Sequence, residues 1–199
     1  MKRLTLVLAT LAIAVAGCSD APTSAPAAPL TPAIAEAPQG AVLGVLALTP
    51  VLQRRTPLPA DITVRARIGA EGGTIAIPEA GFKVVIPSGA VSAPVDFAVT
   101  AVAGRAVAYR MDPHGIRFAR PLVASQELRG TEWIGLPLLN MKAGYYKDDS
   151  QLNPDRALVQ LDEVLPLTFD LWNLRVRFNI EHFSGYVVST GRGAAPLDD

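Results

Sequence analysis

Residues 62–68 read Ile62-Thr63-Val64-Arg65-Ala66-Arg67-Ile68. Apolar side chains alternate with polar or charged ones, so the apolar set would lie on one face of an extended chain and the polar set on the other. An amphipathic helix would instead repeat its apolar side chains every three or four residues. The stretch therefore predicts a β-strand with one face on a core and one face in water.

Similar short runs, rich in β-branched and aromatic residues, recur along the chain. Glycine, proline or aspartate residues separate them, as expected for turns between strands. Besides 62–68, the expected strands are residues 74–77, 83–86, 95–102, 107–111, 122–128, 157–161, 164–169, 174–180 and 186–189. No convincing amphipathic helix interrupts this pattern, which predicts an all-β protein folded as an antiparallel β-sandwich.

The N-terminal region has the pattern of a secretory signal peptide. Lys2 and Arg3 precede an apolar run of roughly a dozen residues, too short for a membrane-spanning helix. The run ends in the tetrapeptide Val15-Ala16-Gly17-Cys18. Small residues ahead of a cleavage site are typical of such peptides, and we expect residues 1–17 to be removed.

Cys18 makes this pattern more specific, because the tetrapeptide resembles the lipobox of bacterial lipoproteins. The resemblance implies that an acylated Cys18 becomes the first residue and contacts the membrane through its lipid. Ser19 follows, and in enteric bacteria a serine here resembles a signal for the outer membrane rather than the inner membrane. We therefore expect a lipid-anchored protein of the bacterial cell envelope, in the outer rather than the inner membrane.

The remaining chain divides by composition. Residues 18–40 are dominated by alanine and proline and predict a disordered tether. Residues 41–57 form an apolar and then basic lead-in, whose first part is either a strand or short helix packed on the domain or an extension of the tether. Residues 58–190 hold the expected sandwich, and residues 191–199 a disordered tail.

Charge and cysteine content exclude several classes of function. Lys and Arg together number 18, as do Asp and Glu, so no basic field favours nucleic-acid binding. Cys18 is the only cysteine, which leaves no thiol for a disulfide, a metal site or a nucleophile once it is acylated. His114 and His182 are the only histidines, and we expect neither a metal nor a cofactor.

Two stretches resemble the ZU-five domain, a β-sandwich named for zonula occludens proteins and netrin receptors. The first reads Gly72-Gly73-Thr74-Ile75-Ala76-Ile77-Pro78 and leads to Val84-Val85-Ile86-Pro87-Ser88-Gly89-Ala90-Val91. The second reads Pro113-His114-Gly115-Ile116-Arg117-Phe118-Ala119-Arg120-Pro121-Leu122. The resemblance implies a ZU-five-like sandwich with an interaction or scaffold role, although the lipid anchor departs from the cytoplasmic setting of the animal family.

The sequence His182-Phe183-Ser184-Gly185 is the main candidate for chemistry. Some ZU-five domains cut themselves between Phe and Ser of such a sequence, which implies attack of the Ser184 hydroxyl on the Phe183 carbonyl with His182 as base. A serine needs such a base, and the reaction also needs a distorted peptide, which Gly185 could permit. The alternative is structural: Phe183 packs inward, and His182 and Ser184 lie on the opposite face.

Other polar and aromatic clusters have ordinary interpretations. Asp148, Asp149, Asn153 and Asp155 predict a solvated hairpin tip rather than a calcium loop. Trp133, Trp172, Tyr145 and Tyr146 predict core positions rather than an exposed binding platform. We expect a monomeric binding or scaffold module for an unidentified envelope protein or polymer, with self-cleavage as the alternative function and hydrolysis of other substrates behind both.

Overall fold

The computed structural model describes residues 48–192. The expected signal peptide (1–17), Cys18, the tether (18–40), the start of the lead-in (41–47) and residues 193–199 of the expected tail lie outside the described residues. Within the described range the chain consists of strands, turns and three short 3₁₀ helices, η1 (Pro78–Ala80), η2 (Leu138–Asn140) and η3 (Asp149–Gln151). No helix in this range is long and apolar enough to cross a membrane.

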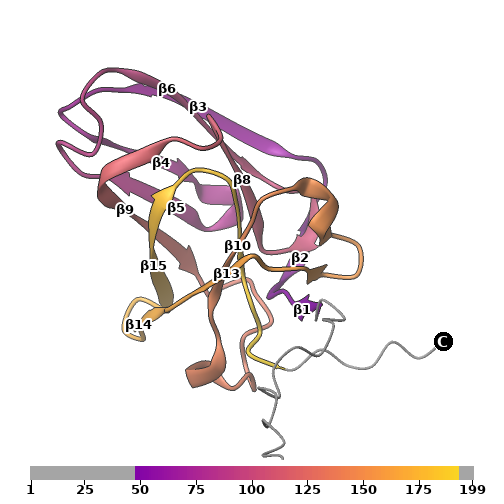
Figure 1. Cartoon of the computed structure of the whole chain (residues 1–199). Helices are drawn as coiled ribbons and strands as arrows, with labels where there is room; N and C mark the ends of the chain where they lie inside the picture. The colour runs from indigo at the N-terminus through magenta and orange to yellow at the C-terminus, as the bar shows by residue number, and fades with distance from the viewer. Residues whose placement is uncertain (1–47, 193–199) are drawn as a thin grey trace, which may run out of the picture. The chain divides into compact units, whose positions relative to one another are not determined.

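Two antiparallel sheets form the sandwich (Figure 1). One sheet has the strand order β13 (Glu163–Leu165), β10 (Ala143–Tyr146), β16 (Gly185–Val188), β8 (Ala108–Asp112), β6 (Val95–Ala101) and β3 (Ile62–Ile68). The other has the order β14 (Thr168–Asp170), β15 (Arg175–His182), β9 (Arg117–Glu127), β5 (Phe82–Ile86) and β4 (Gly73–Ile77). The antiparallel β-sandwich expected from the sequence is therefore confirmed.

Aromatic contacts between the two sheets show where the core lies. The ring of Phe82 on β5 stacks on that of Tyr109 on β8, with ring centroids 3.7 Å apart. Phe178 on β15 lies near Tyr186 on β16, at 6.0 Å. These side chains are almost fully buried, so the inner faces of the two sheets share one apolar core.

The alternation in β3 has the expected structural result. Thr63, Arg65 and Arg67 are exposed, while the residues between them are partly or fully buried. Every residue of β3 pairs with β6 in a continuous antiparallel register. The turn that follows contains Gly72 with φ +79°, where a Cβ atom would lie 2.5 Å from the carbonyl oxygen of Ile86. Glycine is required there for both reasons.

The second part of the lead-in belongs to the folded domain, which begins before the expected residue 58. Val51 and Leu52 are buried, and β2 (Gln53–Leu58) pairs with β7 (Gly104–Ala106). A further small sheet joins β1 (Thr49–Pro50), β12 (Leu158–Val159) and β11 (Leu152–Asn153). The two interpretations concern residues 41–52; packing on the domain applies to residues 48–52, whereas residues 41–47 lie outside the described residues.

Residues 164–169 do not form the single strand that their sequence predicts. Glu163–Leu165 pairs in one sheet as β13, whereas Thr168–Asp170 pairs in the other as β14. Pro166 lies between them, where a missing backbone N–H removes a donor from the ladder. This segment therefore crosses the open side of the sandwich from one sheet to the other (Figure 1).

Candidate functional site

Phe183 and Ser184 form the corner at which the chain passes from one sheet to the other. β15 ends at His182, and β16 begins at Gly185 in the opposite sheet. The Phe183 ring is fully buried, and its centroid lies 5.1 Å from those of both Phe97 and Phe118. The inward packing of Phe183 that the structural interpretation predicted is confirmed.

Backbone hydrogen bonds hold this corner against the loop before β9. The Phe183 N–H donates to the carbonyl of Ile116 at 3.3 Å, and the Phe183 carbonyl accepts from the Gly115 N–H at 3.1 Å. The Ser184 carbonyl accepts from the Met111 N–H at 3.0 Å. A donor thus already points at the carbonyl oxygen that self-cleavage would convert into an oxyanion.

Ser184 is buried, and its hydroxyl lies near His114 rather than on the outer face of a strand. The distance from Ser184 Oγ to His114 Nδ1 is 3.4 Å, and the hydroxyl also donates to the carbonyl of Tyr146 at 3.3 Å. On the other side of the imidazole, His114 Nε2 lies 3.4 Å from Asp112 Oδ1. Serine, histidine and carboxylate therefore lie in a row, and activation of the nucleophile requires the Ser184 hydroxyl proton to turn from the Tyr146 carbonyl to His114 Nδ1.

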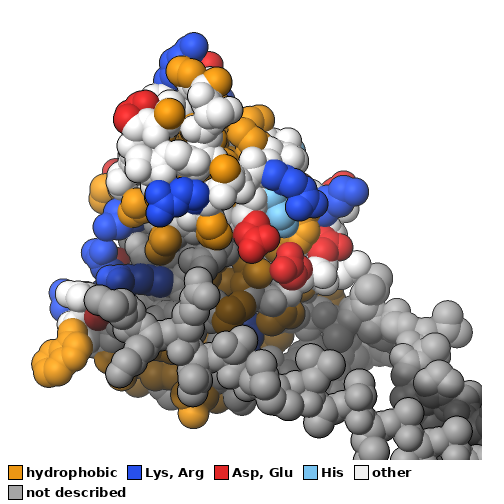
Figure 2. Space-filling view, turned by 60° about the vertical axis from the view of Figure 1, so that its left-hand side comes forward, with side chains coloured by type: hydrophobic (Ala, Val, Ile, Leu, Met, Phe, Trp, Pro, Cys, Tyr) orange, Lys and Arg blue, Asp and Glu red, His pale blue; other side chains and the backbone are white. Residues whose placement is uncertain are grey.

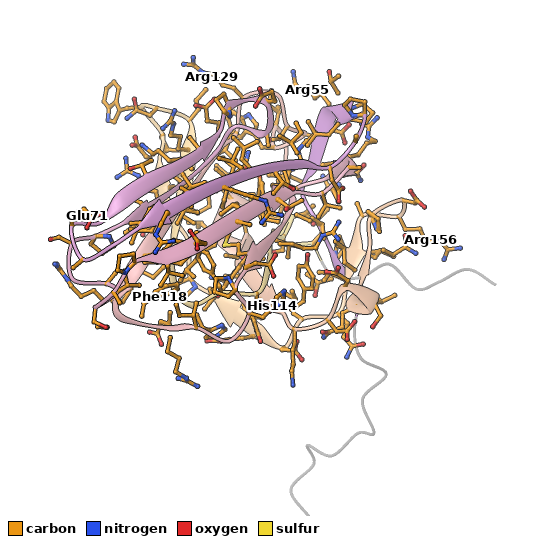
Figure 3. The ribbon with its side chains drawn as sticks, turned by 90° about the horizontal axis from the view of Figure 1, so that it is seen from above. Arg55, Glu71, His114, Phe118, Arg129 and Arg156 are labelled. Atoms are coloured by element: carbon orange, nitrogen blue, oxygen red, sulfur yellow. The ribbon has the colours of Figure 1, made fainter. Side chains whose placement is uncertain are left out.

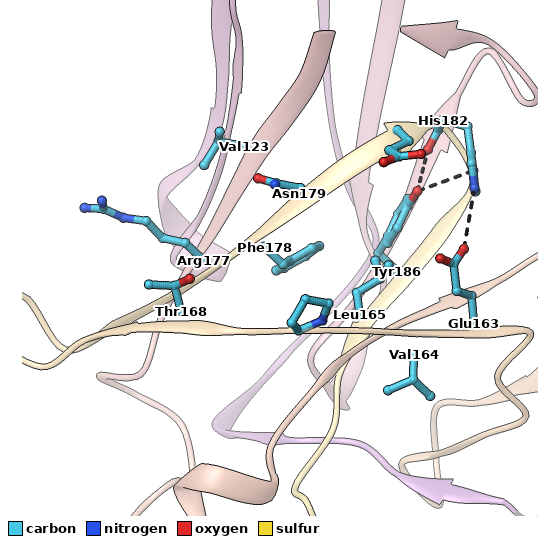
Figure 4. Close-up of a pocket in the computed structure, with 12 residues that line it drawn as sticks. Val123, Glu163, Val164, Leu165, Thr168, Arg177, Phe178, Asn179, His182 and Tyr186 are labelled. Atoms are coloured by element: carbon cyan, nitrogen blue, oxygen red, sulfur yellow. Dashed lines mark hydrogen bonds and ion pairs between the residues drawn. The ribbon is translucent and has the colours of Figure 1, made fainter. Parts of the chain in front are cut away.

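His182 has other partners. Its Nε2 lies 3.9 Å from Glu163 Oε2 and its Nδ1 lies 3.5 Å from the Tyr186 hydroxyl (Figure 4). Its ring stands edge-on to that of Tyr145. The Tyr186 hydroxyl also donates to the His182 carbonyl, and burial raises the pKa of Tyr186 above its ordinary value. The histidine beside the Ser184 hydroxyl is thus His114, which the sequence motif does not include.

The peptide between Phe183 and Ser184 shows neither a cis bond nor a positive φ. Gly185, expected to permit an unusual backbone conformation, also has no positive φ. Its role is steric, because a Cβ atom there would lie 2.3 Å from the ring of Tyr146. The corner therefore supplies a serine–histidine contact and an oxyanion donor, with neither a cis bond nor a positive φ at the peptide that would be cut.

A cleft of about 380 Å³ opens beside this corner. His114, Arg117, Lys147 and His182 line it together with Ser184. The two histidines, far apart in sequence, thus border the same cleft. No group of three or more metal-binding side chains occurs among residues 48–192.

A second cleft, of about 510 Å³, lies between the crossing segment β13–β14 and β15 (Figure 4). Val123 and Leu165 contribute accessible apolar surface over the buried Phe178 and Tyr186, and Arg177 and Glu181 contribute charge. β14 pairs with residues 175–177 of β15 only. The rest of β15 pairs with β9 alone and forms an edge along the cleft.

The remaining candidates divide between those confirmed and one that is wrong. Asp148 caps η3 in an exposed turn, which confirms the expected solvated tip. The hydrogen bond from the backbone N–H of Ser150 lowers the pKa of Asp148. Tyr146 is buried, and Trp133 and Tyr145 are partly buried. Trp172 is 96% exposed at the tip of the β14–β15 hairpin, so its expected core position is wrong.

No model of a known protein family matches the sequence, and no curated protein matches it. The ZU-five resemblance consequently remains a prediction from the two sequence stretches and the His-Phe-Ser motif. Any function has to be argued from the sites themselves.

Proposed function

We propose that this is a lipid-anchored protein of the bacterial cell envelope whose β-sandwich binds an extended segment of another envelope polypeptide. The lipobox-like tetrapeptide ending at Cys18 supports the anchor. The observation that carries the binding role is the cleft of about 510 Å³ beside the edge of β15. The ZU-five resemblance supports the same role, because it implies an interaction module.

The backbone at this edge suits an extended ligand. β14 ends its pairing opposite Arg177, and the continuation of β15 through Phe178 and Ile180 has β9 as its only strand partner. An incoming strand could continue the ladder where β14 stops, which is the usual geometry of β-strand addition. Main-chain hydrogen bonds would supply affinity, and the cleft would receive alternate side chains of the ligand.

The lining indicates which ligand side chains fit. Val123 and Leu165 offer an accessible apolar surface, whereas Arg177 and Glu181 place charges of both signs at the same cleft. Such a site favours a peptide with apolar side chains at alternate positions and polar ones between them. A strongly acidic or strongly basic ligand would meet a like charge.

Site-specific photo-cross-linking in living cells tests this proposal. A benzophenone amino acid at Thr168 or Asn179, both exposed at the cleft, should form a covalent adduct with one defined polypeptide. The same amino acid at Arg65, which is exposed on the distant edge strand β3, is the matched control. Equal adduct formation at all three positions, or none at the cleft, would contradict the proposal.

Self-cleavage at Phe183–Ser184 is the second candidate, favoured by the contact between Ser184 Oγ and His114 Nδ1. His114 would take the hydroxyl proton while Oγ attacks the Phe183 carbonyl carbon. The C–N bond would break, and the Ser184 nitrogen would receive a proton to become an amine. Water would then hydrolyse the ester, leaving a Phe183 carboxylate and a free Ser184 hydroxyl.

Intact-mass measurement of the purified protein tests this candidate. A self-cleaving chain gives two fragments, and both Ser184→Ala and His114→Ala give one uncut mass. His182→Ala still cuts, because His182 contacts Glu163 and Tyr186 instead. A single uncut mass for the unchanged protein would exclude self-cleavage and leave the binding role in place.

A further inference from the structure

Four large apolar side chains are exposed at one end of the sandwich. Leu171 and Trp172 form the tip of the β14–β15 hairpin and are 58% and 96% exposed, while Ile134 and Leu139 are 69% and 88% exposed in the loop after β9. We call these four residues, together with Arg55 and Arg129, the tip surface. Figure 2 shows apolar side chains projecting at the lower left of the molecule with basic side chains beside them.

Hydrogen bonds join the base of the hairpin to the start of the loop. The Leu128 N–H donates to the carbonyl of Leu174, which ties the hairpin to the turn that leads into the loop. The same turn pairs with β2, since the Arg55 N–H donates to the carbonyl of Gly130. Hairpin, loop and β2 are thus joined at this end of the sandwich.

Charge at this end is unbalanced in favour of arginine. Glu127 pairs with Arg175, Glu132 with Arg105, and Asp170 with Arg177. By contrast, Arg55 and Arg129 are exposed and have no carboxylate within salt-bridge distance among residues 48–192. They lie close together on the side away from His114 and Phe118 (Figure 3). The Arg55 Nε donates to the carbonyl of Thr131 at 3.1 Å, which leaves its positive charge without a carboxylate. An anionic partner would thus meet exposed apolar side chains beside two arginine charges that no carboxylate neutralises.

The described chain also begins at this end. The Thr190 N–H donates to the carbonyl of Pro50, and a Cβ atom on Gly191 would lie 2.5 Å from the backbone of Asn140, the neighbour of Leu139. Leu48 lies 30 positions after Cys18 in the sequence, and a fully extended chain over that stretch spans at most about 100 Å. A lipid on Cys18 would therefore keep the tip surface within reach of the bilayer.

We infer that the tip surface contacts the lipid bilayer, with Trp172 and Leu171 inserting at the interface and Arg55 and Arg129 meeting anionic headgroups. Tryptophan has an apolar body and an N–H donor, which suits it to the membrane interface. Exposed apolar side chains beside unpaired basic ones are the chemistry of interfacial binding. This inference rests on the lipid-anchored location proposed above and is independent of what the cleft binds.

Vesicle flotation of residues 18–199 carrying Cys18→Ser, which removes the lipid, tests the surface alone. Vesicles of phosphatidylcholine with three tenths phosphatidylglycerol should retain the protein, and Trp172→Ser with Leu171→Ser should weaken retention by about tenfold or more. Val164→Ser is the matched control, because Val164 is as exposed as Leu171, at 58%, but lies on β13. Arg55→Gln with Arg129→Gln should reduce the preference for anionic vesicles.

Retention that is absent, or unchanged by the Trp172 and Leu171 substitutions, would overturn the inference. So would a dimer in lipid-free solution that the same substitutions dissociate, because the surface would then meet a second copy. Failure of the anchor itself is distinguished separately, since it leaves Cys18 unacylated without affecting vesicle binding. Folding of each variant is checked by urea unfolding, and substitutions at exposed tips should leave the midpoint nearly unchanged.

Discussion

Asp170 links the exposed hairpin tip to the charged network beneath it. Its carboxylate accepts hydrogen bonds from the Asn173 side chain at 2.9 Å and the Asn173 backbone N–H at 3.2 Å, and it pairs with Arg177 at 2.9 Å. The hydrogen bonds from Asn173 are the main cause that lowers the pKa of Asp170 from its ordinary value of 3.8. A carboxylate with a lowered folded-state pKa stabilises the fold above its unfolded pKa, and this stabilisation is lost as the pH falls through the folded pKa.

We therefore predict that Asp170 titrates below 3.8 when followed by NMR. Asn173→Ala should shift the pKa of Asp170 upward, because it removes the side-chain donor. The stability that this substitution costs should be largest near neutral pH and should vanish once the pH falls below the folded-state pKa of the unchanged protein. An unshifted pKa in the unchanged protein would show that the tip is not held as described.

At the residue scale, the sequence identifies part of the candidate site. The His-Phe-Ser motif locates the corner, and the inward position of Phe183 follows from its apolar ring. The contact with His114 could not be read from spacing, because it depends on how β8 and β9 bring a loop to the corner. The exposure of Trp172 could not be predicted either, because a residue's type does not show whether it lies at a hairpin tip that projects beyond the core.

At the scale of elements, β10 and β16 fit together because a glycine faces a tyrosine. Tyr146 on β10 pairs directly with Gly185 on β16, and the ring covers the position where a Cβ atom would lie. We predict that Gly185→Ala destabilises the fold by about 1–3 kcal/mol, as expected for overpacking. Urea unfolding measures this, and an unchanged midpoint would mean that the ring moves aside freely.

Strand prediction succeeded where one face is wet and one is buried. β3, β4 and β5 lie within one residue of the expected segments, because their alternation reflects burial directly. β2 was missed because it contains Pro57 and a buried arginine, Arg54, whose guanidinium donates to backbone carbonyls including that of Val102. Only the tertiary structure brings these carbonyl acceptors to Arg54, so the sequence of Gln53–Leu58 alone indicates a polar segment rather than a strand.

At the scale of the whole molecule, the first described residues are part of the core rather than a passive lead-in. Leu52 is fully buried, its N–H donates to the carbonyl of Val188, and its carbonyl accepts from the Val107 N–H. We predict that Leu52→Ala lowers the free energy of unfolding by about 2–5 kcal/mol, because it leaves a cavity between these strands. Leu139→Ala, at an exposed position, is the control and should change it by less than about 0.5 kcal/mol. Equal effects would contradict the assignment of residues 48–57 to the domain.

The proposed anchor, cleft ligand and membrane contact together would give a molecule with one end at a membrane and the edge of β15 open to a partner. The anchor and the sandwich can be predicted from sequence patterns, whereas the cleft and the tip surface require the tertiary structure. The lipobox-like tetrapeptide is a local pattern, and alternation of side chains predicts the sandwich. The cleft and the tip surface exist only after distant segments meet, as when the Leu128 N–H reaches the Leu174 carbonyl.

The intact mass of the protein extracted from bacterial membranes tests the lipid-anchored role most directly. The expected mass corresponds to a chain that begins at Cys18 and carries acyl groups on that residue, and Cys18→Ser should abolish both the modification and the membrane association that depends on it. A chain that begins at another residue, or an unmodified Cys18 in the native protein, would contradict the proposed anchor.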